Sequence, residues 1–83
     1  MRVKVDSLVI TFATTAAAMS CEVLCHEKGL PGRMIPVPTQ VSAGCGLAWK
    51  ASPADRPALE AALGDGGVAW EAMQIVGLWE LSA

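Results

Sequence analysis

The sequence has little charge, one histidine and no long apolar run. Its charged residues make up 17% of the chain, and the formal net charge is -2. The six Lys and Arg residues are scattered along the sequence. No basic patch is therefore available for nucleic acid. A single histidine cannot build a histidine-rich metal site, and no apolar run reaches the ~18 residues of a membrane helix. We expect no metal, cofactor, nucleic-acid or membrane partner.

The cysteines are too few and too sparse for a disulfide framework. They are three in number, at Cys21, Cys25 and Cys45, and an odd set leaves at least one thiol unpaired. Small secreted domains usually carry a dense, even set of cysteines. The sequence therefore favours a protein of the reducing cytoplasm.

The first 21 residues have a superficial likeness to a secretory or lipoprotein signal. Arg2 and Lys4 come first, and an uncharged stretch then leads to Cys21. Asp6 lies in the approach to that stretch, and threonines interrupt its apolar part, which is atypical of a signal core. We expect this segment to form a strand and a helix start instead.

Eighty-three residues are enough for one small domain with a modest core. We expect a core over about residues 7–76 and a C-terminal tail over 77–83. Hydrophobic residues make up 53% of the chain, so some apolar surface should stay exposed. Together with Trp79 in the tail, this predicts a homodimer.

Apolar periodicity and turn residues predict the order strand, helix, strand, strand, helix, strand. Thr14 and Thr15 offer hydroxyls to cap the first helix, and Gly29 supplies its stop. This order indicates an α+β, ferredoxin-like βαββαβ sandwich, a four-stranded antiparallel sheet with two helices on one face. The expected strands are 8–12 (led in by Val3 and Val5), 33–35, 47–51 and 68–76, and the expected helices are 16–28 and 53–63, the second with Ser52 as N-cap.

Each helix has an apolar stripe that should pack on the sheet. The residues we expect to be buried there are Ala18, Cys21, Leu24, Cys25, Leu59 and Leu63. The spacing of Cys21 and Cys25 could also present two thiolates to a metal. His26 lies on another helix face, however, so a four-ligand set is not completed, and core cysteines are the favoured interpretation.

The segment between the second and third strands contains the third cysteine. Pro36 and Pro38 stop the strand and stiffen the entry to the loop, because they fix φ and lack N–H donors. Gly44 and Gly46 flank Cys45 and leave its thiol little shielded. Two interpretations stay open: a tight turn that holds a small apolar residue, or a cysteine that another molecule can approach.

Residues 29–38, followed by Val41-Ser42 and Cys45-Gly46-Leu47-Ala48, resemble a small bacterial family of selenium/sulfur carrier-like proteins. Its members carry Pro-x-Pro, a polar and serine-rich stretch, and Cys-Gly before an apolar strand. The resemblance extends outward to residues 8–12 and 68–75. This chain departs from the pattern at Thr39, where a basic residue is usual, and at Ala43 and Gly44, where serines are usual.

The resemblance implies that Cys45 accepts sulfur or selenium from a donor protein and passes it to an acceptor protein. Pro36, Pro38, Ser42, Gly44 and Gly46 would form the supporting loop. In the expected topology the loop lies at the same sheet edge as the start of the first helix, whose dipole and whose Thr14 and Thr15 would favour a thiolate or persulfide.

The chain reads as a carrier more than as a stand-alone enzyme, because no base, metal set or phosphate loop accompanies Cys45. The alternative is a non-catalytic, dimeric module that binds a ligand or a protein through an exposed sheet face or edge.

Overall fold

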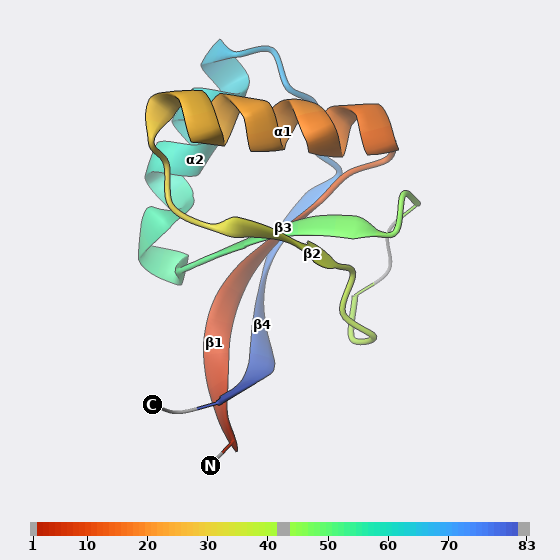
Figure 1. Cartoon of the computed structure of the whole chain (residues 1–83), viewed down its shortest axis with the longest axis vertical. Helices are drawn as coiled ribbons and strands as arrows, with labels where there is room; N and C mark the ends of the chain where they lie inside the picture. The colour runs from red at the N-terminus through yellow and green to blue at the C-terminus, as the bar shows by residue number, and fades with distance from the viewer. Residues whose placement is uncertain (1, 42–43, 82–83) are drawn as a thin grey trace.

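The computed structural model describes residues 2–41 and 44–81. Strands and helices follow one another in the predicted βαββαβ order, with one 3-10 turn before the second helix (Figure 1). The elements are β1 (Arg2–Thr11), α1 (Thr15–Lys28), β2 (Arg33–Pro36), β3 (Leu47–Ala51), the 3-10 turn η1 (Pro53–Asp55), α2 (Arg56–Asp65) and β4 (Ala72–Leu81).

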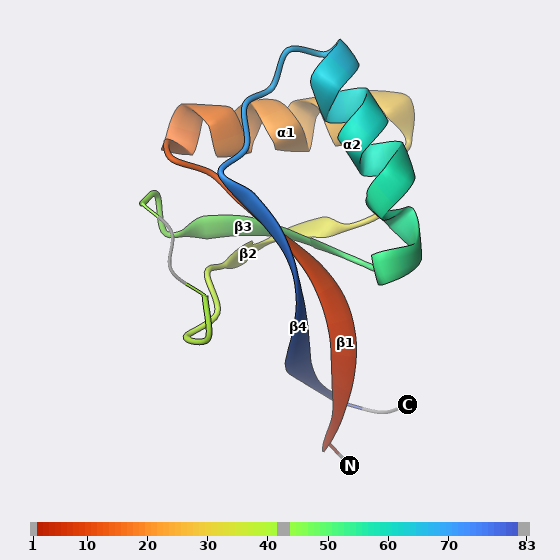
Figure 2. The same ribbon diagram turned by 180° about the vertical axis from the view of Figure 1, so that it is seen from behind.

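The sheet has the strand order β2-β3-β1-β4, and all neighbouring strands are antiparallel. Ile10 in β1 lies opposite Trp49 in β3 and Met73 in β4. Both helices cover the same face of the sheet (Figures 1 and 2). The predicted α+β sandwich of ferredoxin-like arrangement is confirmed.

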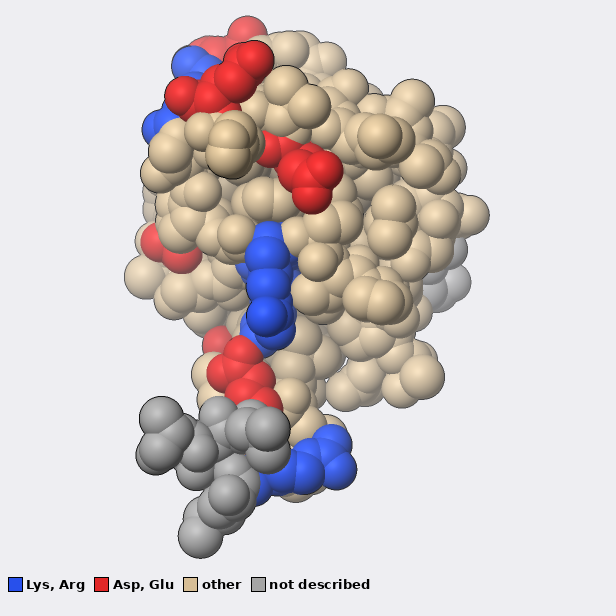
Figure 3. All heavy atoms as spheres, viewed as in Figure 1, with Lys and Arg blue, Asp and Glu red and all other residues tan. Residues whose placement is uncertain are grey.

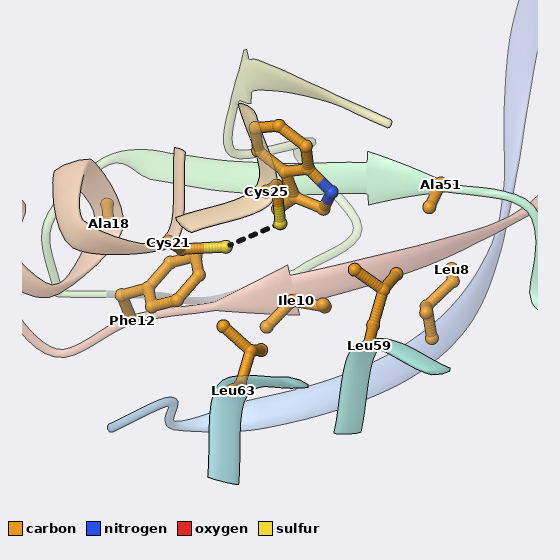
Figure 4. Packing of buried hydrophobic residues seen from close by; sticks show 10 residues of the cluster. Leu8, Ile10, Phe12, Ala18, Cys21, Cys25, Ala51, Leu59 and Leu63 are labelled. Atoms are coloured by element: carbon orange, nitrogen blue, oxygen red, sulfur yellow. Dashed lines mark hydrogen bonds between the residues drawn. The ribbon is translucent and has the colours of Figure 1, made fainter. Parts of the chain in front are cut away.

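The main core lies between the sheet and the helices. Alternate residues of β1 and its continuation, Leu8, Ile10 and Phe12, point toward the helices and are fully buried, as period-two alternation requires (Figure 4). The helices contribute Ala18, Cys21, Cys25, Leu59 and Leu63, all with no exposed surface. These five predicted core positions are confirmed.

Leu24 was expected in the buried stripe but is only half-buried. Its side chain reaches past the sheet-facing stripe to the turn after α2, where a Cβ at Gly66 would lie 2.9 Å from one of its methyl carbons. Leu24 therefore packs between the helix layer and that turn, at the margin of the core.

A smaller apolar cluster occupies the opposite face of the sheet. Val9 and Ala48 contribute from the central strands, and Val41 contributes from the β2–β3 connection; all three are buried. Half-buried residues surround them: Ile35, Val37, Val76 and Leu78. The connection from β2 to β3 thus folds onto the face that the helices leave open.

The caps of α1 follow the prediction. The Thr14 hydroxyl accepts a hydrogen bond from the Ala17 N–H at 3.1 Å, and Thr15 is the first helical residue. Gly29 ends the helix at φ 64°, a left-handed conformation in which the Leu30 N–H bonds to the Cys25 carbonyl at 2.8 Å.

The second helix starts later than predicted. Residues 53–55 form the 3-10 turn η1, and α2 itself begins at Arg56. Pro57 has no N–H to reach the Pro53 carbonyl, so the Arg56 N–H takes that carbonyl in a tighter turn. Ser52 keeps its predicted place before the turn, and its N–H donates to the Asp55 carboxylate at 3.2 Å. The helix then runs to Asp65, two residues beyond the expected end.

The last strand begins and ends later in the chain than the sequence predicts. β4 spans Ala72–Leu81 where 68–76 was expected, and residues 77–81 belong to a strand where a tail was expected. The reason is the length of β1, which pairs with β4 over ten positions from Arg2 opposite Leu81 to Thr11 opposite Ala72. Residues 68–71 are needed to return the chain from the helix layer to the sheet.

The outer halves of β1 and β4 form a two-stranded arm, which we define as residues 2–7 and 76–81. β3 pairs with β1 only from Leu8 onward, so the arm extends beyond the helices (Figure 2). An ion pair between Lys50 and Glu80 links β3 to the arm and holds the pKa of the Glu80 carboxyl below its ordinary value. Arg2 and Lys4 each lie 5.6 Å from the centre of the Trp79 ring.

Candidate functional site

The β2–β3 connection is closed at its base by the backbone. The Val37 N–H donates to the Gly46 carbonyl at 3.0 Å, directly beyond the end of β2 at Pro36. A second turn follows, in which the Val41 N–H donates to the Pro38 carbonyl at 3.0 Å. The two prolines therefore sit at the entry to a folded loop, as predicted, and the buried Val41 fixes this loop to the sheet.

Gly44 brings the loop against the start of α1. A Cβ at residue 44 would lie 3.2 Å from the carbonyl oxygen of Ala13, the residue immediately before the N-cap Thr14. A glycine permits this close approach of two backbone segments. The predicted proximity of the cysteine loop to the first helix is thus visible in the backbone itself.

Cys45 is half-buried, and its sulfur lies beside the backbone of Leu47. The thiol donates to the Leu47 carbonyl at 3.3 Å, and the sulfur accepts from the Leu47 N–H at 3.4 Å. Gly46 makes this turn possible with φ 77°, a conformation that favours glycine. The other side of Cys45 packs against the main core cluster.

Among the described residues, the hydrogen bonds of the Cys45 sulfur go to Leu47 and not to Thr14 or Thr15. The Thr14 hydroxyl oxygen is engaged in the helix cap. Ser42 and Ala43 lie outside the described residues. The sequence analysis did not predict that the Leu47 backbone N–H and carbonyl would contact the Cys45 sulfur. The one sequence signal for this contact is Gly46, which allows the chain to turn so that the Leu47 backbone lies next to the sulfur.

The other two thiols differ sharply from Cys45. Cys21 and Cys25 have no exposed surface, and their sulfurs lie 3.9 Å apart on one face of α1 (Figure 4). Burial raises the pKa of both thiols, and the neighbouring Cys25 raises that of Cys21 further. Both are therefore protonated at neutral pH. His26 is exposed, on a different face of the helix.

The cysteine loop and the segment that leads into α1 contain no charged side chains. Residues 34–49 and 7–21 contain no Lys, Arg, Asp or Glu, and Figure 3 shows an uncharged area on the side of the start of α1 and of the loop. Thr39 is exposed, and its hydroxyl donates to the neighbouring Gln40 amide oxygen at 3.4 Å. Within the loop segment, the electrostatic field at Cys45 therefore comes from peptide dipoles and not from charged side chains.

A cleft of about 640 Å³ lies elsewhere, between the second half of α1 and β2. The cleft includes none of the loop residues around Cys45. Separately, no cluster of three His, Cys, Asp or Glu side chains among the described residues could hold a metal ion. No described helix has the length and apolar character that crossing a membrane requires. The residues that line the cleft between α1 and β2 are Glu22, Val23, His26, Glu27, Leu30, Gly32, Arg33, Met34 and Trp49.

Comparisons with known proteins give one finding. No curated protein and no solved structure matches the chain. A family model described as "Putative Se/S carrier protein-like" matches residues 7–74, which include both helices, the cysteine loop, all of β2 and β3, and parts of β1 and β4. Because this match covers far more than half of the sequence, the chain belongs to that selenium/sulfur carrier-like family.

Proposed function

We propose that this protein carries sulfur or selenium on Cys45. The donor would be a protein that holds the chalcogen as a persulfide or its selenium analogue. The Cys45 thiolate attacks the outer sulfur of the donor persulfide, a new S–S bond forms on Cys45, and the donor cysteine leaves with the electron pair of the broken bond. The acceptor protein's nucleophile repeats this exchange in the second step, and Cys45 leaves as a thiolate. No external oxidant or reductant is consumed.

One observation carries this proposal: Cys45 is the accessible thiol among three. Cys21 and Cys25 are buried, whereas Cys45 is half-buried in a loop and has a backbone N–H directed at its sulfur. Thiol exchange requires that a second protein reach the sulfur, so exposure separates a usable cysteine from a structural one. Family membership supplies the chalcogen as the cargo.

The Leu47 N–H is a hydrogen-bond donor for the thiolate or persulfide that the proposed carrier would form on Cys45. In the neutral thiol the sulfur both donates to and accepts from Leu47. On ionisation the sulfur loses its proton and the bond to the carbonyl, but it keeps the N–H, which is a better partner for a negative sulfur. The start of α1 adds the partial positive charge of unpaired N–H groups next to the loop.

The lack of charged residues within the loop segment affects how an anion on Cys45 would be stabilised. Residue 39 is a threonine here, so the stabilisation of an anion on Cys45 falls to peptide dipoles. Dipole-based stabilisation changes less with salt than a surface ion pair does. Such a carrier would work in a reducing compartment such as the cytoplasm, where its thiols stay free.

Incubation with a cysteine desulfurase and cysteine tests the proposal directly. We expect intact-mass analysis under non-reducing conditions to show the mass of one added sulfur atom, which a thiol reductant removes. Cys45→Ser should fold and gain nothing, because serine suits the same turn. The matched control, Cys21→Ala with Cys25→Ala, should still gain sulfur. Equal loading of the Cys45→Ser chain would contradict the role of Cys45. No loading of the natural chain would favour the alternative of a binding module whose turn needs small residues only for its geometry.

A further inference from the structure

The outer edge of β4 is a free strand edge with little protection. Within residues 2–41 and 44–81, β1 is the only strand that pairs with β4. Soluble proteins usually shield such an edge with lysine, proline or a bulge, yet β4 contains neither lysine nor proline. Its one charged residue, Glu80, is already paired with Lys50. The Gln40 amide covers a single carbonyl, that of Gly77, at 3.2 Å.

Two large apolar side chains on this strand are exposed in a symmetric arrangement. Ile75 is 48% exposed and Trp79 is 57% exposed. They are four residues apart, so both lie on the same face of the sheet, and Gly77 is midway between them. A strand with this pattern is complementary to a second copy of itself that runs in the opposite direction.

We propose that β4 is the interface of a homodimer in which the β4 strands of two copies pair antiparallel about a two-fold axis at Gly77. In this register Ile75 faces Trp79 of the second copy, and the contact occurs twice. On the opposite face Val76 faces Leu78 of the second copy. Both residues already pack on the small cluster around Val9, so the dimer extends that cluster across the interface.

Symmetry and charge select this register over its neighbours. A two-fold axis perpendicular to the sheet keeps the helices of both copies on one side. Residues that lie opposite each other must then be on the same face of the sheet, so the alternative registers place the axis at another residue of β4. An axis at Val76 would place Ile75 opposite Gly77 and Gln74 opposite Leu78. With the axis at Gly77, Glu80 faces Gln74 of the second copy, whose amide can donate to the carboxylate.

The pairing joins the two four-stranded sheets into one and satisfies the free backbone groups of both edges. The Gly77 carbonyl can serve both Gln40 and the second strand, because a carbonyl oxygen has two lone pairs. The dimer thus uses the one strand edge that carries both a central glycine and flanking apolar side chains.

Light scattering and sedimentation at roughly tens of micromolar protein test the assembly. We expect the natural chain to be a dimer and Ile75→Lys to be a monomer, with dimerisation weakened about 100-fold or more because an unpaired charge is buried against Trp79. Val23→Lys is the matched control: Val23 is 54% exposed on α1, and its replacement should leave the dimer intact. A monomeric natural chain, or a dimer that persists in Ile75→Lys, would overturn the proposal.

Cross-linking tests the register and does not depend on whether Ile75→Lys folds. In a Cys45→Ser background, Gly77→Cys places two cysteines opposite each other at the axis, within disulfide reach. We expect mild oxidation to cross-link this chain. Gln74→Cys is the control, because in this register its two copies lie about 20 Å apart and should not cross-link. Equal cross-linking of both variants, or of neither, would contradict the Gly77 axis.

Discussion

Phe12→Ala is expected to lower the free energy of unfolding by about 3–5 kcal/mol, the largest effect of any single substitution considered for this fold. Phe12 has the largest side chain among the fully buried residues that the structure describes. It lies in the core cluster where β1, α1 and α2 meet (Figure 4). Alanine would leave a cavity that the surrounding helices can fill only in part. The total stability of so small a domain is about 4–12 kcal/mol, so much of the variant could unfold.

Urea unfolding followed by circular dichroism measures this loss. Val23→Ala is the matched control, because Val23 is exposed on α1 and its truncation should change stability by about 0.5 kcal/mol or less. A Phe12→Ala midpoint close to that of the natural chain would show that the core is not organised around this residue.

Raising the pH above 8.5 is expected to destabilise the protein through its two buried thiols. Burial raises the pKa of Cys21 and Cys25 in the folded state, so the folded chain holds protons that the unfolded chain releases. The stabilisation is complete below the unfolded pKa of ~8.5 and is lost as pH rises toward the folded pKa values. Over the pH range in which the folded thiols stay protonated, the expected slope approaches about 1.4 kcal/mol per pH unit for each thiol.

The measurement is the urea midpoint at a series of pH values from 7 to 10. Cys21→Ala should remove about half of the slope, and Cys21→Ala with Cys25→Ala should remove most of it, whatever their stability at neutral pH. If the double variant lost stability with pH as steeply as the natural chain, other groups would have to carry the titration.

Much of the fold could be predicted because local signals agree with the tertiary structure. Leu8, Ile10 and Phe12 alternate with residues of the opposite face, and Thr14 and Gly29 mark the ends of α1 through capping and left-handed geometry. β4 was misplaced because residues 68–76 and 72–81 are both apolar enough for a strand. Pairing with β1 decides between them, and that pairing is a tertiary property.

The candidate site could be predicted only in part. Glycines on both sides of Cys45 indicated an open turn, and the helix stripe indicated buried positions for Cys21 and Cys25. The contact of Gly44 with Ala13 and the Leu47 N–H at the Cys45 sulfur depend on how the loop packs. Residue types carry no direct signal for backbone groups that approach through tertiary packing.

The alkylation rate of each thiol in the native protein tests most directly whether Cys45 alone is available for chemistry. A short pulse of iodoacetamide at pH 7, followed by unfolding, a heavy-isotope label and peptide mapping, gives the three rates in one sample. Cys21 and Cys25 are buried and protonated, so they should react only when the fold opens. We predict that Cys45 is labelled at least about 100-fold faster than either; equal slow labelling of all three thiols would contradict the account.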